Sequence, residues 1–205
     1  MIGLILKDLF TLTRQALMYI VFIAVFSLMP GYNMASFAVM MACMMPMTAL
    51  AYDERSHWDR LAASMPYTTA QLVLSKYLMG LMLMLCSVAL GIIALPLQRL
   101  VNPDVSLPEL LSVSLGALGA GMLIQGVLLP VMFRFGTEKA RLFMLVLMGA
   151  VFAGIAALGQ AQDALRSFIE GMNGGAVAAV LAGLAATAYL VSMPLSIRAY
   201  RRRNS

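Results

Sequence analysis

The sequence predicts an all-α protein that crosses a lipid bilayer six times and keeps both ends in the cytoplasm. First, 62% of the 205 residues are apolar and only 11% are charged, whereas a soluble domain averages about half apolar and a quarter charged. Second, the charged residues stand between long apolar blocks, as in proteins whose helices span a membrane. Third, the basic residues gather on one of the two sides that these blocks define. This composition excludes a soluble enzyme, a disordered chain and a small disulfide-rich secreted domain.

Blocks without charged residues define the six spans. The first block, Gln15–Tyr52, is long enough for two helices of roughly 20 residues each. Pro30 and Gly31 mark the turn between them, because Pro and Gly are the strongest breakers of regular structure. Four further blocks are each long enough to cross once. The expected helices cover residues 16–30, 33–51, 72–97, 109–130, 141–159 and 173–196.

The spans and their connections form one transmembrane domain, residues 1–205. Residues 1–14 mix apolar and charged side chains, which is typical of a helix lying in the membrane interface. Residues 160–172 have a similar amphipathic pattern and are expected at the outer surface. The cytoplasmic connections are expected to be residues 52–71 and 131–141.

The basic residues orient these spans. Twelve of the 14 Lys and Arg residues fall in the two termini, in the two connections named above or at the adjoining helix end. Only Arg99 and Arg166 fall on the opposite side. Because cytoplasmic loops carry an excess of Lys and Arg, both termini are expected in the cytoplasm. The net charge of +5 is thereby explained by membrane orientation, and nucleic acid is not an expected partner.

The spans lack the residues that chemistry within a membrane would need. No span has a charged side chain at its centre, and the only histidine, His57, falls in a connection. Metalloprotease, nucleophile-elbow and phosphate-binding-loop motifs are absent. We therefore expect no catalytic residue, no metal site and no cofactor in this chain. Met41 and Met45 share a helix face, a spacing that suits Cu(I), but flexible apolar packing is the simpler interpretation.

The connection 52–71 is longer than a chain reversal requires. Trp58, Leu61 and Met65 recur at helical spacing and predict a short amphipathic helix parallel to the membrane, followed by Thr68 or Thr69 as the cap of the next helix. Such a helix could dock on a cytoplasmic protein; a solvated loop of mixed charge is the alternative.

In the connection 131–141, Gly136 is expected to end one helix and Thr137 to cap the next. A partner contact and a simple positively charged turn explain this connection equally well.

Short motifs resemble, in the expected order, those of the small permease subunits of the ABC-2 exporter family. Leu6-Lys7-Asp8 is similar to the family's "LKD" opening. The family's "DE…W…LPv…v.sKY" segment is matched by Asp53-Glu54, Trp58-Asp59, Met65-Pro66 and Ser75-Lys76-Tyr77. Residues 135–141, FGTEKAR, are similar to the family's "FG.EK.R" loop. The resembled subgroup includes bacterial exporters of amphipathic peptides such as phenol-soluble modulins.

The resemblance implies a multi-pass protein of the bacterial plasma (inner) membrane and a dimer of permeases, either homodimer or heterodimer. It also implies two separately encoded ATPase subunits, which bind ATP and Mg²⁺, so that this chain is not itself the enzyme. The connection 52–71 would seat in the ATPase as a coupling helix. By this match the ATPase-coupling candidates are Asp53, Glu54, Trp58 and Asp59, followed by Glu138, Lys139 and Arg141.

The expected function is therefore that of an ABC exporter permease, coupling ATP hydrolysis in the partner to export of an amphipathic or hydrophobic substrate such as a peptide. The few polar groups and methionines expected along its substrate path are Ser27, Asn33, Ser36, Met41, Met45, Thr48 and Gln125. The alternative is an ATP-independent channel, or a membrane scaffold that dimerises through rows of small residues such as Gly175, Ala179 and Gly183.

Overall fold

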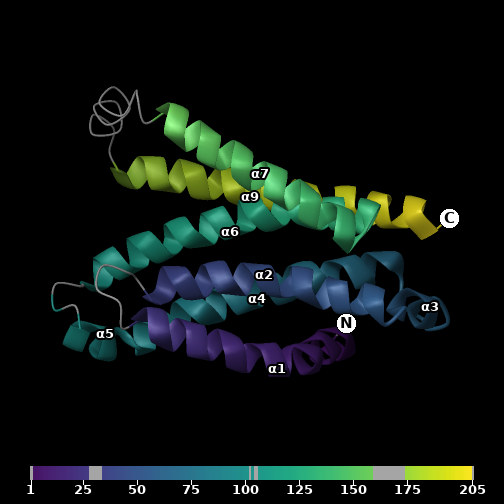
Figure 1. Cartoon of the computed structure of the whole chain (residues 1–205), viewed down its shortest axis with the longest axis horizontal. Coiled ribbons are helices and arrows are strands. Elements are labelled where there is room, and N and C mark those ends of the chain that lie inside the picture. Colours follow the sequence, from purple (N-terminus) through teal and green to yellow (C-terminus); the bar gives the residue numbers. More distant parts are fainter. Residues whose placement is uncertain (1, 28–33, 102, 104–105, 159–173, 205) are drawn as a thin grey trace.

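The computed structural model describes residues 2–27, 34–101, 103, 106–158 and 174–204, and every regular element in these ranges is an α-helix (Figure 1). The helices are α1 (Ile2–Ser27), α2 (Met34–Arg55), α3 (Trp58–Ala63), α4 (Thr69–Ile93), α5 (Leu95–Val101), α6 (Leu107–Phe135), α7 (Thr137–Leu158) and α9 (Gly174–Asn204). This confirms the expected all-α class.

Three of the described helices contain segments that are long and apolar enough to cross a membrane: Ser36–Arg55, Thr69–Ile93 and Leu110–Phe135. These segments fall within α2, α4 and α6, and they match three of the expected spans. The six-span arrangement and the cytoplasmic position of the termini stay predictions.

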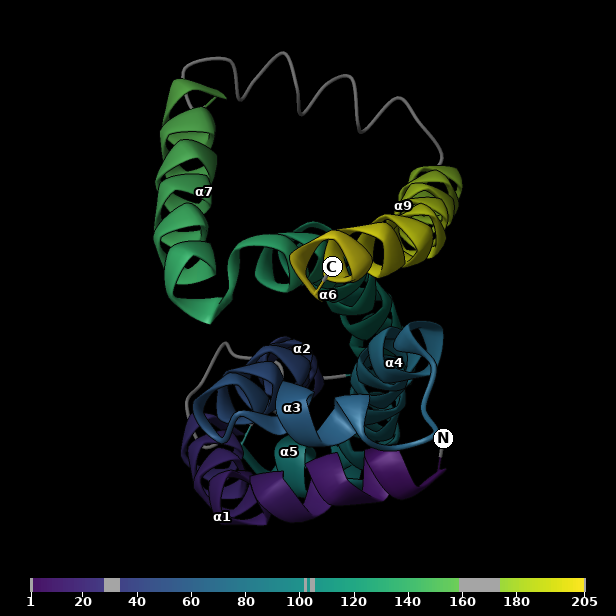
Figure 2. The same cartoon turned by 90° about the vertical axis from the view of Figure 1, so that its right-hand side faces the viewer.

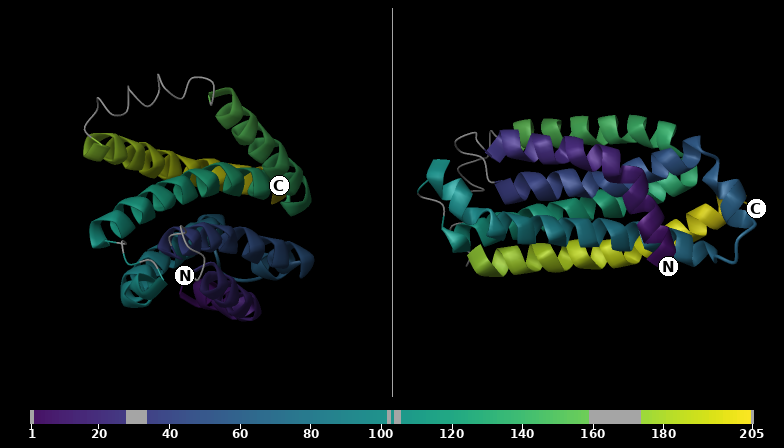
Figure 3. Two further views of the ribbon diagram at one scale, coloured as in Figure 1. Left: turned by 60° about the vertical axis from the view of Figure 1, so that its left-hand side comes forward. Right: turned by 90° about the horizontal axis from the view of Figure 1, so that it is seen from below.

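The long helices run alongside one another with α6 in the middle (Figure 1). On one side of α6 lies α9, its most extensive partner, and on the other side lie α2 and α4, with α1 outside them. The ends of the chain and α3 lie at one end of the bundle, and α5 lies at the opposite end (Figures 1 and 3). We refer to the first as the termini end. Helix α7 packs on α6 and α2 there and diverges from the rest toward its other end (Figure 2).

Local sequence signals explain several helix boundaries. Thr68 precedes α4 and forms a capping box with Gln71, in which each residue's side chain bonds the other's backbone N–H; this confirms a predicted cap. Gly136 separates α6 from α7 with φ of 84°, a left-handed conformation that glycine adopts without steric cost. The interfacial segment 1–14 and the first span were expected as separate elements, but both belong to a continuous α1. This helix changes direction along its length (Figure 3).

The core lies where α4, α6 and α9 meet. Val73, Tyr77, Leu129, Phe133 and Tyr189 are buried there in one apolar cluster. Helices α2 and α4 approach α6 closely beside this cluster. A Cβ atom at Gly80 would lie 2.6 Å from the Gln125 side chain and 2.8 Å from Cγ of Pro46, so the absence of a side chain at this position permits the approach.

Candidate functional site

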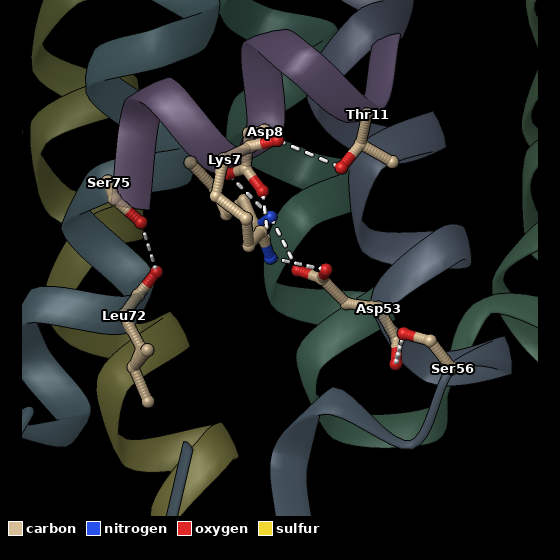
Figure 4. Close-up of polar contacts among 8 residues, drawn as sticks. Lys7, Asp8, Thr11, Asp53, Ser56, Leu72 and Ser75 are labelled. Atoms are coloured by element: carbon tan, nitrogen blue, oxygen red, sulfur yellow. Dashed lines mark hydrogen bonds and ion pairs between the residues drawn. The ribbon is translucent and has the colours of Figure 1, made fainter. Parts of the chain in front are cut away.

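Four charged side chains from three helices meet at the termini end of the bundle. Lys7 and Asp8 come from α1, Asp53 from α2 and Lys76 from α4. Nζ of Lys76 lies 2.7 Å from Oδ2 of Asp8 and 2.6 Å from Oδ2 of Asp53. Nζ of Lys7 lies 3.0 Å from Oδ1 of Asp8 and 2.5 Å from Oδ1 of Asp53 (Figure 4). Each ammonium group therefore bridges both carboxylates, and we call this set the ionic cluster.

Two members of the ionic cluster, Asp8 and Lys76, are buried, whereas Lys7 and Asp53 are partly exposed. Asp8 is 1% exposed and Lys76 is 4% exposed. A charge removed from water is tolerated only when opposite charges and hydrogen bonds replace the lost hydration. The alternating arrangement of two lysines and two aspartates provides the opposite charges, and Oδ1 of Asp8 has an ion pair with Lys7 but no hydrogen bond among the described residues. Since its members come from α1, α2 and α4, the cluster fixes the ends of these three helices relative to one another.

Trp58 connects α3 to the ionic cluster. It is the first residue of α3, and Nζ of Lys7 lies 4.2 Å from the centroid of its ring, which is the geometry of a cation–π interaction. His57 precedes it in the left-handed region, with φ of 51°, so the chain turns sharply between α2 and α3. The first residue of α3 therefore contacts the ionic cluster, which joins α1, α2 and α4.

Glu54, next to Asp53, bonds a different helix. Its Oε2 accepts a hydrogen bond of 2.7 Å from the backbone N–H of Thr137 and another from the Thr137 hydroxyl. Thr137 is the first residue of α7, where backbone N–H groups lack partners within the helix and a negative charge is favourable. The sequence suggested Thr137 itself as the cap, but in the structure the cap is a carboxylate supplied by α2.

Three further ATPase-coupling candidates lie in the second connection and face solvent. Glu138, Lys139 and Arg141 are exposed, and together with Arg55 and His57 they border a hollow of ≈ 400 Å³ between the two connections. The two connections that the sequence places far apart thus form one surface. The backbone of Asp59 belongs to α3, but its side chain lies outside the described residues.

A second polar network lies deeper in the bundle. The hydroxyl of Tyr77 is 2.6 Å from Oγ of Ser192 and 2.7 Å from Oγ of Ser196. The hydroxyl of Tyr189 lies 2.8 Å from the Tyr77 carbonyl oxygen and 3.0 Å from Oε1 of Gln125. Gln125 Nε2 in turn donates to the Cys43 carbonyl at 2.9 Å. This network links α2, α4, α6 and α9.

Sequence reasoning selected only Gln125 from this network. The spacing of Tyr189, Ser192 and Ser196, which places all three on one face of a helix, was the available signal for the others. Lys7, Asp8 and Lys76 were also not selected as site residues, although all three occur in the motifs quoted above.

The expected substrate-path residues do not converge in this conformation. Gln125 is fully buried, and Met45 is buried against Leu12 and Met79. Ser36 and Met41 are half-buried, and Thr48 borders a cavity between α2, α6 and α7. The side chain of Ser27 and the whole of Asn33 lie outside the described residues. The path itself stays a prediction.

Within the described ranges, no group of three or more His, Cys, Asp or Glu side chains could hold a metal ion. The site consists of three kinds of contact: the ionic cluster between α1, α2 and α4, the Trp58–Lys7 contact between α3 and α1, and the Glu54–Thr137 contact between α2 and α7. A family model described as ABC-2 family transporter protein matches residues 3–201, a range that includes the whole ionic cluster. No curated protein and no solved structure matches the chain.

Proposed function

The chain belongs to the ABC-2 family of transporter proteins, and we propose on this basis that it is the permease subunit of an ATP-driven exporter. Membership of this family, together with the apolar helices, makes it a multi-pass membrane transport component. The finer proposal is that it couples ATP hydrolysis by a separate ATPase subunit to export of an amphipathic or hydrophobic substrate, such as a peptide.

The observation that carries this proposal is the convergence of the family-like motifs at the root of α3. Lys7 and Asp8 belong to one motif of the sequence, and Asp53 and Lys76 belong to the two ends of a second. The four side chains form one ionic cluster. Trp58, from the same set of motifs, stacks on it. A helix rooted in such a joint can transmit force, because a movement of α3 displaces α1, α2 and α4 together.

In this proposal α3 is the coupling helix, and the residues around it divide into two roles. Asp53 and Glu54 are positioning residues, since their carboxylates bind other helices of the same chain. The docking surface for the ATPase is formed by exposed side chains: Leu61 and Met65, which are 54% and 37% exposed, and the second-connection candidates Glu138, Lys139 and Arg141.

The proposed cycle is alternating access. Closure of two ATPase subunits on ATP and Mg²⁺ would draw the α3 helices of two permease subunits together. The ionic cluster would pass this movement to α1, α2 and α4, and the Glu54–Thr137 contact would pass it to α7. In this arrangement the termini end faces the cytoplasm of a bacterial cell, and the second permease is either an identical or a related chain.

The test is transport and ATP hydrolysis in proteoliposomes that contain this chain and the ATPase encoded beside it. We expect Trp58→Ala to abolish export while ATP hydrolysis continues, because α3 would lose its contact with Lys7. Trp58→Phe, which keeps an aromatic face for the cation, should restore most of the transport. Intact export by Trp58→Ala would contradict the role of α3. Substrate flux without any ATPase would instead favour the channel alternative.

A further inference from the structure

A second cavity lies between α2, α6 and α7 near the termini end of the bundle. Its volume is ≈ 170 Å³. Four methionines, Met44, Met47, Met132 and Met144, supply much of its wall, and the buried members pack with Leu128 and Ala140 in one apolar cluster. The cavity lies beside the contact by which Glu54 holds the first turn of α7 to α2, and α7 diverges from the bundle beyond that turn (Figure 2).

The mouth of the cavity is positively charged. Arg141 is exposed and borders this cavity as well as two adjoining hollows, both of which are also bordered by Arg55. In the part of the chain that the structure describes, no carboxylate forms an ion pair with Arg141. Glu138 borders one of the adjoining hollows, and Glu54 is bound to Thr137. The cavity therefore combines an apolar interior with a cationic rim.

The depth of this cavity matches the boundary between hydrocarbon and headgroups. Its α2 residues run from Met44, at the middle of the membrane-spanning segment Ser36–Arg55, to Ala51, about one turn before the end of that segment. Its α7 residues, Thr137 to Met144, lie in the first two turns of that helix. An Arg side chain at this level reaches phosphate groups, and basic pockets between transmembrane helices on the cytoplasmic side bind anionic headgroups.

We propose that this cavity binds an anionic phospholipid of the inner leaflet, with the phosphate at Arg141 and part of one acyl chain between the methionines. The inference rests on the proposed orientation, in which the termini end faces the cytoplasm. An apolar cavity of about 150 Å³ accepts a ligand the size of benzene, so ≈ 170 Å³ takes a segment of an acyl chain and leaves the remainder in the bilayer. Methionine suits such a flexible ligand because its side chain adapts to irregular shapes.

Occupation of the cavity would place the lipid against the contact between α2 and α7. Thr137, whose N–H and hydroxyl bind Glu54, is itself part of the cavity wall. A bound acyl chain would fill the space into which α7 must move if it closes on α2. The lipid is thus placed to set the position of α7.

The experiment is native mass spectrometry of the detergent-purified full-length chain titrated with phosphatidylglycerol or with phosphatidylcholine of the same acyl chains. We expect preferential retention of phosphatidylglycerol, and a loss of about fivefold in its affinity for Arg141→Gln, the effect of removing one cation near an anionic headgroup. The matched control is Arg134→Gln, because Arg134 is an exposed cation at the end of α6 that contacts the Phe135 ring. Met144→Trp, which fills the cavity from a half-buried position, should lower retention of both lipids.

Three results would overturn this proposal. Equal retention of the two lipids by the unmodified chain would remove the charge argument. An equal loss in Arg134→Gln and Arg141→Gln would show attraction to surface charge without a site. Binding seen in the monomer and lost on dimerisation would assign the cavity to a second copy of the chain. Each variant is compared only if its melting temperature is retained. Since no ATPase is present, a failure here leaves the coupling proposal standing, and a failure of coupling leaves the lipid result standing.

Discussion

The two carboxylates at the end of α2 hold different parts of the molecule in different ways. Asp53 enters a buried cluster of four charges in which every ammonium group meets both carboxylates, and this fixes α1, α2 and α4 together. Glu54 caps the first turn of α7, a helix that diverges from the bundle beyond that point (Figure 2). Two adjacent residues of α2 thus make different attachments: Asp53 joins three helices, and Glu54 binds only the start of α7.

Helix geometry explains why neighbouring residues serve such different partners. Successive side chains on an α-helix are rotated by about 100°, so Asp53 and Glu54 cannot face the same neighbour. The end of α2 is therefore attached to α1 and α4 through Asp53 and to α7 through Glu54. The joint with α1 and α4 is expected to stay intact during movement, whereas the attachment of α7 is expected to act as a pivot. Each of the following changes tests one side of this comparison.

The largest effect is expected from Lys76→Met, which removes a buried cation from the ionic cluster. Asp8 and Asp53 would then share only Lys7, and breaking a buried pair costs about 3–5 kcal/mol because the remaining charge is uncompensated. Thermal unfolding in detergent should show a correspondingly large loss of stability. The double variant Lys76→Met with Asp8→Leu restores neutrality, leaves the Lys7–Asp53 pair and should recover much of the loss. Unchanged stability in Lys76→Met would show that the ionic cluster does not hold α1, α2 and α4 together.

A smaller loss is expected from Gly80→Ala, which tests the close packing of α4 on α2 and α6. The added Cβ would lie 2.6 Å from the Gln125 amide and 2.8 Å from Pro46, and overpacking of this kind costs about 1–3 kcal/mol. The control is Gly149→Ala in α7, where a Cβ would meet nothing within 4 Å. Because Ala is a better helix former than Gly, this control should be neutral or slightly stabilising. Equal losses of stability in Gly80→Ala and Gly149→Ala would contradict the expectation that α4 is closely packed at Gly80 and α7 is not at Gly149.

The smallest of the three losses is expected from Glu54→Ala, which removes the cap of α7. Loss of a helix cap costs about 1 kcal/mol, so the chain should stay folded while the start of α7 loosens. The distribution of distances between spin labels on α2 and α7 should broaden, whereas the distribution for labels on α2 and α4 should stay narrow. Thr137→Val, which removes the hydroxyl contact and keeps the N–H contact, should give a weaker form of the same result. Broadening between α2 and α4 as well would mean that the two attachments are not separate.

Sequence patterns predicted several elements well because the responsible physics is local. The capping box at Thr68 and Gln71 depends on residues three apart, and the break at Gly136 depends on one residue's conformational freedom. The short helix that Trp58 begins was expected from three apolar residues at helical spacing, although Met65 lies beyond its end. Residues 1–14 and the first span were expected as an interfacial helix and a membrane span, and the structure joins them in one helix, α1, because no breaker interrupts that stretch. The interfacial position of residues 1–14 stays a prediction.

The sequence by itself determined the all-α class, the apolar character of the helices and the family, because composition, periodicity and short motifs carry this information. Only the tertiary structure decided what the motif residues do. Lys76 and Asp8 are 68 positions apart and Lys7 and Asp53 are 46 apart, and such pairs form only when helix packing sets the register of one helix against another. The same packing brings Asp53 against Lys7 and Lys76, and Glu54 against Thr137. The sequence did not predict these contacts, and the role of both carboxylates in ATPase coupling stays a prediction. A charged residue in an apolar sequence indicates that its side chain needs an ion-pair or hydrogen-bond partner, and helix packing decides which residue that partner is.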